Sequence, residues 1–227
     1  MGTVQELHDF NAASYRAIAQ SFDRTRRGPW REIVAFVQDI EPGCKILDLG
    51  CGNGRLLEAL PHVNFDYTGV DSNEYLITQA RKRWPGRDFR VGSFESMELT
   101  LAEYDKIFFV AGFHHVPGPA ERIAVLQRCH DALKSGGSLL LTVWNLWQPQ
   151  YLQYLFKNWN LKVSWNDFFV PWRDADAVVW RYYHGFMHNE LAALLNAAGF
   201  KNLEFLTPLY LNQGQLKRKN YVVRAVK

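Results

Sequence analysis

The sequence predicts an α/β protein built on one doubly wound, mostly parallel sheet of seven strands, and three observations support this fold class. The apolar run at 46–49 enters a loop with glycines at 50, 52 and 54, and an amphipathic pattern follows at once. Four further apolar runs, ending at residue 143, alternate with patterns of helical spacing. Two short stretches at 202–206 and 220–226 indicate a closing antiparallel pair.

The composition indicates a single domain over residues 1–227, with enough apolar residues for a substantial core. The mean hydropathy is −0.24 and no apolar run reaches membrane-spanning length, so we expect no membrane contact. The beginning of the chain lacks the regions of a secretory signal. Its three cysteines are scattered, which supports neither a disulfide framework nor a zinc ribbon and favours the cytoplasm. The net charge of +3 permits a polyanionic partner without requiring one.

A helical lid is expected over residues 1–42. Apolar residues recur at helical spacing from 6 to 22, a basic turn follows, and a proline at position 29 suits the first turn of a second helix that runs to about residue 40. A helix before the first strand can close over a ligand at the strand ends. Tyr15, Arg24 and Arg26 would then lie near the ligand, where an arginine could pair with a carboxylate.

The loop after the first strand is expected to bind the ligand. Its residues are Gly50, Cys51, Gly52, Asn53 and Gly54. Glycines let the backbone turn sharply and let a ligand approach it closely. A dinucleotide fingerprint would need a glycine where Arg55 stands, and the Gly-Lys-Ser/Thr of a P-loop is absent. The loop therefore belongs to neither of these nucleotide-binding types.

Two carboxylates flank this corner. Asp48 lies just before the loop, and Asp71, with Ser72 beside it, ends the next apolar run about 20 residues after Gly50, the spacing of a carboxylate that accepts ribose hydroxyls. Both suit a ligand with a cationic amino group and a ribose diol. The pattern Asp-x-Gly-x-Gly-x-Gly with a second, spaced Asp resembles the class I S-adenosylmethionine (SAM) methyltransferases, which implies a Rossmann-like fold and SAM as cofactor. A glycine-rich turn with solvated acids is the alternative.

This resemblance places further cofactor contacts at later strand ends. Ser93 and Phe94 follow the strand at 89–91, where the class brackets the adenine. Many relatives carry Asp at the place of Ser93, which leaves Phe94 to cover the ring. Val110 and Ala111 end the strand at 104–110, and ligands of open α/β sheets bind beyond the carboxyl ends of the strands. We expect the loop at 111–116 to border the transferred methyl.

His114 and His115 stand together in that loop. Adjacent residues in an extended segment point opposite ways, and no further His or Cys lies nearby at ligand spacing, so we expect no metal site. One histidine is expected to pack and the other to face the cleft. A helix at 119–133 is expected to end in a cap and turn at 134–137, before the strand at 138–143.

After the fifth strand the periodic pattern breaks. Residues 144–183 lack clean strand or helix periodicity, apart from a short helix at 151–158, and a helix at 189–198 follows. Insertions at strand ends in α/β enzymes usually carry substrate recognition. Residues 144–186 are therefore predicted to be a substrate-recognition insertion.

Four stretches outside the glycine loop narrow the resemblance. They are Tyr15-x-x-Ile18-Ala19-x-x-Phe22-x-x-Thr25-Arg26-x-x-Pro29-Trp30, Phe113-His114-His115-Val116, Phe168-Phe169-Val170-Pro171-Trp172 and Trp180-Arg181-Tyr182-Tyr183-His184-Gly185-Phe186. They resemble the tRNA wobble-uridine carboxymethyl methyltransferases, including the methyltransferase domain of the tRNA-modifying AlkB homologue. That family makes the methyl ester of 5-carboxymethyluridine, and its eukaryotic members work with a small zinc-binding activator. The resemblance implies a tRNA substrate and such an activator as a partner, although the insertion here lacks their acidic run.

A carboxylate with a pKa near 4 is already ionised at neutral pH, so methyl transfer to it requires no general base. The enzyme must align the reactants and hold an anion, which an arginine does well. Arg181 is therefore predicted to orient the carboxylate. Tyr182, Tyr183 and His184 are expected to shape the pocket, and His115 to border the methyl path.

RNA backbone contacts are expected from Arg24, Arg27, Lys157, Lys162, Arg173 and the run at 217–219, and base stacking from Trp165 and Trp172. Two other functions stay open. One is a small-molecule O-methyltransferase that acts on a carboxylate or a hydroxyl. The other is a non-catalytic SAM- or RNA-binding subunit that stabilises a partner.

Overall fold

The computed structural model describes residues 2–26, 28, 33, 37, 39–174, 177–206, 209–212, 215–218 and 220–227. The helix expected at 29–40 falls mostly on residues outside this set. Arg27 and the side chains of the basic run at 217–219 also lie outside it.

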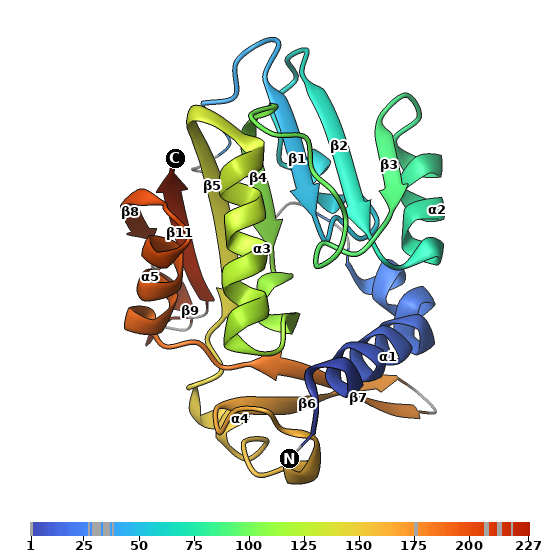
Figure 1. Cartoon of the computed structure of the whole chain (residues 1–227). Coiled ribbons are helices and arrows are strands. Elements are labelled where there is room, and N and C mark those ends of the chain that lie inside the picture. The colour runs from blue at the N-terminus through green and yellow to red at the C-terminus, as the bar shows by residue number, and fades with distance from the viewer. Residues whose placement is uncertain are drawn as a thin grey trace.

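Seven strands form the central sheet, in the order β3-β2-β1-β4-β5-β11-β8 (Figure 1). They are β1 (Lys45–Leu49), β2 (Asp66–Asp71), β3 (Asp88–Val91), β4 (Tyr104–Val110), β5 (Leu133–Trp144), β8 (Lys201–Leu206) and β11 (Asn220–Val226). The first five pair in parallel, and β11 pairs antiparallel with β5 and β8. The strand order reverses between β1 and β4, which confirms the predicted doubly wound, mostly parallel sheet.

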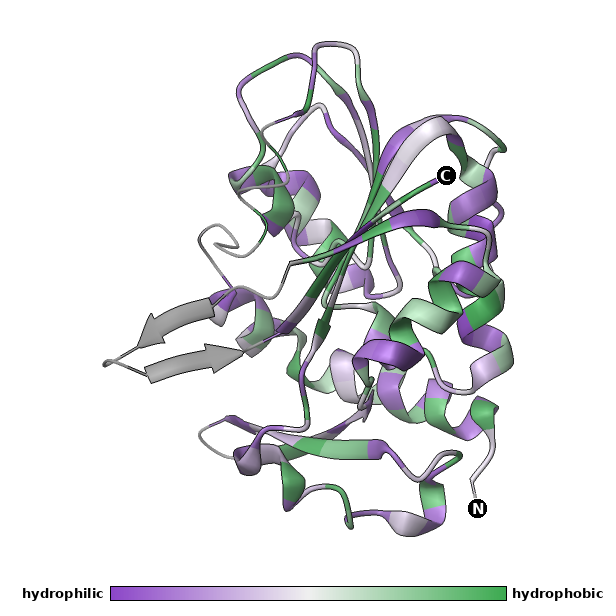
Figure 2. Ribbon diagram, turned by 90° about the vertical axis from the view of Figure 1, so that its left-hand side faces the viewer, coloured by the Kyte–Doolittle hydropathy of each residue, from purple (hydrophilic) through white to green (hydrophobic). Residues whose placement is uncertain are grey.

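Helices cover both faces of this sheet. They are α2 (Glu74–Arg83) on one face, and α3 (Pro119–Ala132) and α5 (His188–Ala197) on the other. Leu47 and Leu49 of β1 belong to the apolar core under α3 and α5, whereas Ile46 belongs to the core under α2. Burial on both faces explains why apolar residues occupy both sides of β1, and Figure 2 shows hydrophobic positions, in green, through the middle of the central sheet. None of the described helices is long and apolar enough to cross a membrane.

Helix α1 (Val4–Thr25) lies across the carboxyl edge of the sheet (Figure 1). It begins with a capping box in which the Glu6 N–H donates to the Thr3 hydroxyl at 3.2 Å and the Thr3 N–H donates to the Glu6 carboxylate at 2.7 Å. The Ser14 hydroxyl donates to the Trp180 carbonyl at 2.7 Å, which joins α1 to the strand beneath it.

That strand belongs to an antiparallel hairpin made of β6 (Asp167–Asp174) and β7 (Ala177–His184). Neither strand was expected from the sequence. The inner halves of both strands are buried on two faces, which removes the alternation of apolar and polar residues that marks a strand. Pro171 lies inside β6, which is possible because a two-stranded ribbon consists of edge strands, and these accept proline. A second unexpected hairpin joins β9 (Leu209–Asn212) to β10 (Gln215–Arg218).

Three local expectations are wrong. The short helix predicted at 151–158 is instead α4 (Pro149–Leu152), followed by turns and the 3₁₀ helix η4 (Trp159–Leu161). The segment 134–137, predicted as a cap and turn, is instead part of β5. Leu133 already pairs with Tyr104 of β4, and a shift in the pairing register accommodates the extra residues that follow. The helix expected after the glycine loop is a single 3₁₀ turn, η2 (Arg55–Glu58). Pro61 prevents its continuation, since it lacks an N–H and disfavours helical geometry in the residue before it.

Gly54 offers a test of how tightly this corner is packed. Its φ is +75°, and a Cβ added there would lie 2.8 Å from Cδ1 of Trp84 and 3.0 Å from Cζ of Phe89. Gly86 has a similar φ of +88° but no atom within 4 Å. Gly86→Ala should cost about 1–2 kcal/mol of unfolding free energy, from backbone strain alone. Gly54→Ala should cost about 1–3 kcal/mol more through overpacking, measured by urea denaturation. Equal losses in the two variants would contradict this packing.

Candidate active site

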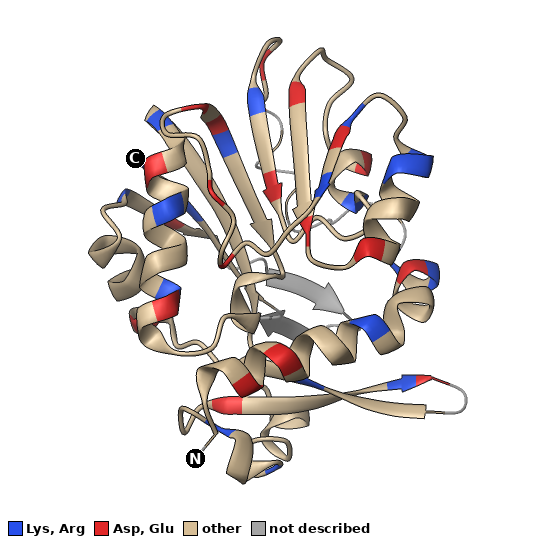
Figure 3. Cartoon of the chain, turned by 45° about the vertical axis from the view of Figure 1, so that its right-hand side comes forward, with Lys and Arg blue, Asp and Glu red and all other residues tan. Residues whose placement is uncertain are grey.

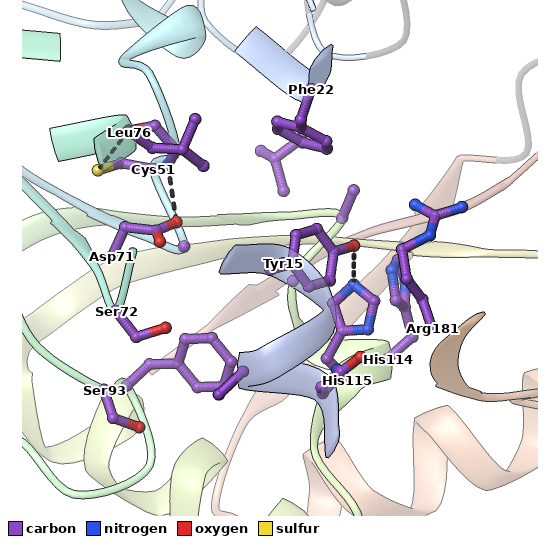
Figure 4. A pocket seen from close by; sticks show the side chains of 18 of the residues that line it. Tyr15, Phe22, Cys51, Asp71, Ser72, Leu76, Ser93, His114, His115 and Arg181 are labelled. Atoms are coloured by element: carbon purple, nitrogen blue, oxygen red, sulfur yellow. Dashed lines mark hydrogen bonds between the residues drawn. The ribbon is translucent and has the colours of Figure 1, made fainter. Parts of the chain in front are cut away.

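A cavity of about 340 Å³ lies at the carboxyl ends of β1, β2 and β4, with α1 across it (Figure 4). This volume is within the range of small-molecule sites. The cavity brings together most of the predicted cofactor contacts: Tyr15, Arg26, Asp48, Gly50, Cys51, Gly52, Asn53, Asp71, Ser72, Ser93, Phe94, Val110 and Ala111. Gly54 was also predicted to bind the cofactor, but it does not line the cavity, because its Cα faces Trp84 and Phe89 in the packing behind the loop.

Backbone N–H groups hold the carboxylate of Asp71 at the end of β2. One oxygen accepts from the Gly52 N–H at 2.9 Å, and the other accepts from the Asn73 N–H at 2.8 Å (Figure 4). Burial raises the pKa of Asp71, against these two bonds, which favour the anion. Each oxygen keeps a lone pair, so Asp71 can still accept from the hydroxyls of a ribose.

Asp48 is 2% exposed and accepts a 2.7 Å hydrogen bond from the Tyr67 hydroxyl. Burial raises its pKa to about 7, a shift that the Tyr67 bond opposes and the Asp71 charge increases. A cationic amino group bound beside Asp48 would replace the missing counter-charge. Asp48 lies one residue before the end of β1 and Asp71 ends β2, and Figure 3 shows acidic positions, in red, near the carboxyl ends of the central strands.

The chemistry of this donor set fits SAM. Two carboxylates suit its amino group and its ribose hydroxyls, and Ser93 and the Phe94 ring lie at the end suited to the adenine. Arg26 lines the same cavity and stacks over the rings of Phe22 and Trp172. A guanidinium at this position could pair with a carboxylate. The left-handed loop at Gly50 and Gly52, with φ of +68° and +56°, leaves the backbone open to close approach.

The two histidines occupy a 3₁₀ helix, η3 (Phe113–His115), and not the extended segment that was expected. Both line the cavity, so the expectation that only one would face it is wrong. The His115 Nδ1–H donates to the Tyr182 carbonyl at 2.8 Å, which leaves Nε2 to accept from the Tyr15 hydroxyl at 2.8 Å. Burial lowers the pKa of His115 to about 3, and the Arg181 cation adds to this, against the bond to Tyr182.

Arg181 is 3% exposed and lines the cavity beside His115 (Figure 4). Its guanidinium carbon lies over four aromatic rings, those of Tyr15 at 6.0 Å, Trp144 at 5.8 Å, Trp172 at 5.0 Å and Tyr183 at 5.2 Å. It makes no ion pair with any described residue. Within the described part of the chain, its Nε and the Tyr183 hydroxyl are buried without hydrogen-bond partners. A buried cation of this kind is completed by an anionic ligand.

Tyr182 and His184 were predicted to shape the pocket, but neither lines it. Side chains alternate along a strand, so Arg181 and Tyr183 face the cavity while Tyr182 and His184 face away. Behind the strand, His184 lies between Asp167 at 3.0 Å and Glu190 at 2.7 Å. The Tyr182 hydroxyl donates to Asp167 at 3.0 Å. These residues hold β7 from behind, and none of them reaches the reacting groups.

Sequence reasoning missed several residues of the cavity. His8 on α1 lies 2.8 Å from the carboxylate of Glu95 in the loop after β3, and both line the cavity. Burial disfavours protonation of His8, but the bond to Glu95 and the charges of Glu95, Glu121 and Asp9 together outweigh it and raise the pKa. No local signal marks this pair, because only the fold brings them together. Asn73 does not line the cavity but supports it, because its amide donates to the Tyr15 carbonyl at 3.0 Å; it could have been found as a helix N-cap.

One predicted RNA contact is also wrong. Lys162 is 2% exposed, and its ammonium donates to the carbonyls of Leu155 and Trp165, so it holds the loop together from within. Arg24, Lys157 and Arg173 are exposed, and Arg24 lies 3.5 Å from Asp174. Among the described residues, no group of three or more His, Cys, Asp and Glu could hold a metal ion.

Residues 46–137 match the family model of a methyltransferase domain. The chain is 30% identical over 151 residues to the tRNA (carboxymethyluridine(34)-5-O)-methyltransferase ALKBH8 of Macaca fascicularis. The aligned region covers 64% of this chain and 22% of that protein. It is 35% identical over 166 residues to the trans-aconitate 2-methyltransferase of Acidovorax ebreus (strain TPSY). This aligned region covers 71% of this chain and 59% of that protein. The chain therefore spans less than two thirds of either curated relative.

The fold matches that of a solved SAM-dependent methyltransferase from Methanosarcina mazei. The two structures align with a TM-score of 0.70 at 23% sequence identity, over 88% of this chain and 99% of the other. At this identity the likeness concerns the fold.

The raised pKa of Asp48 predicts a pH-dependent stability. A carboxyl whose pKa rises from 3.8 to about 7 on folding stabilises the protein fully below about pH 4, and this contribution is lost as the pH rises to about 7. Between pH 4 and pH 8, Asp48→Asn should therefore gain up to about 4 kcal/mol of unfolding free energy relative to the wild type, measured without SAM. Asp66→Asn, at the exposed start of β2, is the control. Parallel pH profiles for Asp48→Asn and the wild type would refute the buried carboxyl.

Proposed function

Because this chain carries a methyltransferase domain and has the fold of the class I SAM-dependent methyltransferases, we propose that it methylates a carboxylate, that of 5-carboxymethyluridine at the wobble position of tRNA. When bound, SAM supplies a methyl group on a positively charged sulfur, which a nucleophilic oxygen attacks. The observation that carries the proposal is the buried guanidinium of Arg181, which faces the cavity without an ion-pair partner among the described residues.

The basicity of the cavity supports a carboxylate over a hydroxyl acceptor. A hydroxyl must lose its proton to a general base, whereas a carboxylate is already ionised at neutral pH. The pKa of His115 is about 3, and burial holds the pKa of His114 well below its ordinary value, with repulsion from His115 and Arg181 adding to it. The two histidines of η3 are therefore neutral and too weakly basic to take such a proton, and His8, the third histidine of the cavity lining, is paired with Glu95 in the loop after β3. Asp48 has a higher pKa than the histidines of η3, but it lies beside the glycine loop, where its carboxylate accepts a hydrogen bond from the Tyr67 hydroxyl.

Three arginines line the cavity, Arg26, Arg55 and Arg181. The Arg55 side chain donates to the Gly28 carbonyl at 2.6 Å, so Arg26 and Arg181 are the two candidates to bind anions. Both of their guanidinium groups lie over the Trp172 ring, at 5.1 and 5.0 Å, and burial together with repulsion from Arg181 lowers the pKa of Arg26. The carboxylate of the cofactor accounts for one anion. A carboxylate on the acceptor accounts for the other, held by Arg181 with the unpartnered Tyr183 hydroxyl as a second donor.

The aromatic lining supports a nucleobase as the carrier of that carboxylate. Trp144 stacks on Tyr183, with ring centroids 5.1 Å apart and an interplanar angle of 20°, and both line the cavity. Planar bases are recognised on such surfaces, stacked on aromatic side chains. The relative from Macaca fascicularis, which is named for carboxymethyluridine of tRNA, agrees with this acceptor.

A small polycarboxylate is the second candidate acceptor. The relative from Acidovorax ebreus is named for trans-aconitate, and a cavity lined by three arginines also suits a small anion. The two candidates share the carboxylate chemistry and differ in the rest of the acceptor.

The decisive assay incubates the protein and SAM with tRNA that lacks the ester, and in parallel with trans-aconitate. Mass spectrometry of digested nucleosides should detect 5-methoxycarbonylmethyluridine, with and without a co-expressed zinc-binding activator, which is the protein partner that we propose. Methylation of trans-aconitate alone would favour the second candidate. No transfer to either acceptor, with SAM bound, would favour a non-catalytic subunit.

Arg181→Lys keeps the positive charge but removes the planar, bidentate donor. We expect kcat/KM for the carboxylate acceptor to fall about 10- to 100-fold, the value of one or two charge-assisted hydrogen bonds, while the affinity for SAM in calorimetric titration changes little. Arg90→Lys, on the exposed strand β3, is the matched control. An unchanged kcat/KM in Arg181→Lys would refute the role of Arg181.

A further inference from the structure

Three large aromatic side chains of the insertion stand in solvent, outside the cavity. Phe156 is 75% exposed, Trp159 is 53% exposed and Trp165 is 57% exposed. They belong to the loop between α4 and β6, which we call the aromatic loop, 153–166. Exposed rings of this size, gathered on one short loop, mark an interaction surface more often than scattered single residues do.

The aromatic loop is held in a defined shape from within. The buried ammonium of Lys162 donates to the carbonyls of Leu155 and Trp165, which ties the two ends of the loop together. The same ammonium lies 5.0 Å from the centroid of the Trp159 ring. The Gly2 N–H donates to the Lys162 carbonyl at 3.2 Å and braces the loop from outside. Its rings are therefore presented on a preformed surface, which lowers the entropy lost on binding.

Ring contacts connect the start of this segment to the acceptor end of the cavity. Tyr151 of α4, just before the aromatic loop, lies 6.2 Å from Trp144, and Trp144 stacks on Tyr183. Trp165 lies 5.5 Å from the half-buried Trp147. Aromatic side chains thus continue from the cavity wall to the surface. An RNA acceptor longer than one nucleotide could contact both the cavity wall and the exposed rings.

The charge of this region suits a polyanion. No Asp or Glu occurs from residue 132 to residue 166, whereas Lys157 is exposed on the aromatic loop. Figure 3 shows the loop beneath β6 with blue positions and no red ones. The polar side chains between the rings include the amides of Asn158 and Asn160, which can bond to the edges of bases. Rings, amides and an exposed cation, without acids, are the groups with which proteins bind single-stranded nucleic acid.

We propose that the aromatic loop stacks unpaired bases of the RNA that flank the modified nucleotide, through Phe156 and Trp159, with Lys157 on a phosphate. This inference rests on the proposed tRNA substrate. A protein partner is the alternative occupant, and the test below separates the two.

The experiment measures binding of a fluorescein-labelled anticodon stem-loop RNA to the full chain, together with the kinetics on whole tRNA. Phe156→Ala and Trp159→Ala should each raise the Kd and the KM for tRNA about tenfold, with kcat changed less than twofold. Trp159→Phe, which keeps a stacking ring, should recover most of the affinity. Leu101→Ala is the matched control, because Leu101 is 72% exposed and precedes β4, at the amino-terminal ends of the parallel strands and therefore away from the cavity.

Salt dependence distinguishes stacking from charge. The slope of log Kd against log salt should stay unchanged in Phe156→Ala and fall by about 1 in Lys157→Gln. Phe156 is too exposed for its loss to unfold the chain, which circular dichroism verifies. Unchanged Kd and KM for tRNA in Phe156→Ala and Trp159→Ala would overturn the inference. So would variants that keep these two values but no longer bind a protein partner. A wild type that methylates no tRNA would refute the proposed substrate instead.

Discussion

The buried guanidinium of Arg181 is the charge around which the acceptor side of the cavity is arranged. Burying a cation without a carboxylate is costly, and here four aromatic rings offset part of that cost through their electron-rich faces. Two of these rings belong to the hairpin itself, one to α1 and one to the end of β5. Burial lowers the pKa of His115 and the same guanidinium adds to this, so the neighbouring imidazole stays neutral.

The alternation of side chains along β7 divides the work between two faces of one strand. Arg181 and Tyr183 face the cavity, while Tyr182 and His184 face Asp167 and Glu190 behind it. This rear network satisfies its buried polar groups internally, and such networks rigidify a structure only when they are complete. A rigid β7 matters because an arginine can align a carboxylate only when its own position is held.

Helix α1 covers the cavity and is held there by hydrogen bonds to the residues around it. Its Tyr15 donates to His115, its Asn11 accepts from the backbone of β7, and the Asn53 amide of the glycine loop donates to Asp23 at 2.7 Å. The lid is therefore joined to both the cofactor side and the acceptor side of the cavity.

The sequence by itself determined the central sheet and the cofactor corner, because both are local in the chain. Strand, glycine loop and Asp48 occur within ten residues or so, and the spacing to Asp71 follows from one crossover. Only the tertiary structure decided the acceptor side. The β6–β7 hairpin is buried on both faces of its inner half, so its residues carry no period of two, and its faces could not be assigned. Without those faces, Tyr182 and His184 could not be separated from Arg181 and Tyr183. Pairs such as His8 with Glu95 lie far apart in the chain, and only packing brings them together.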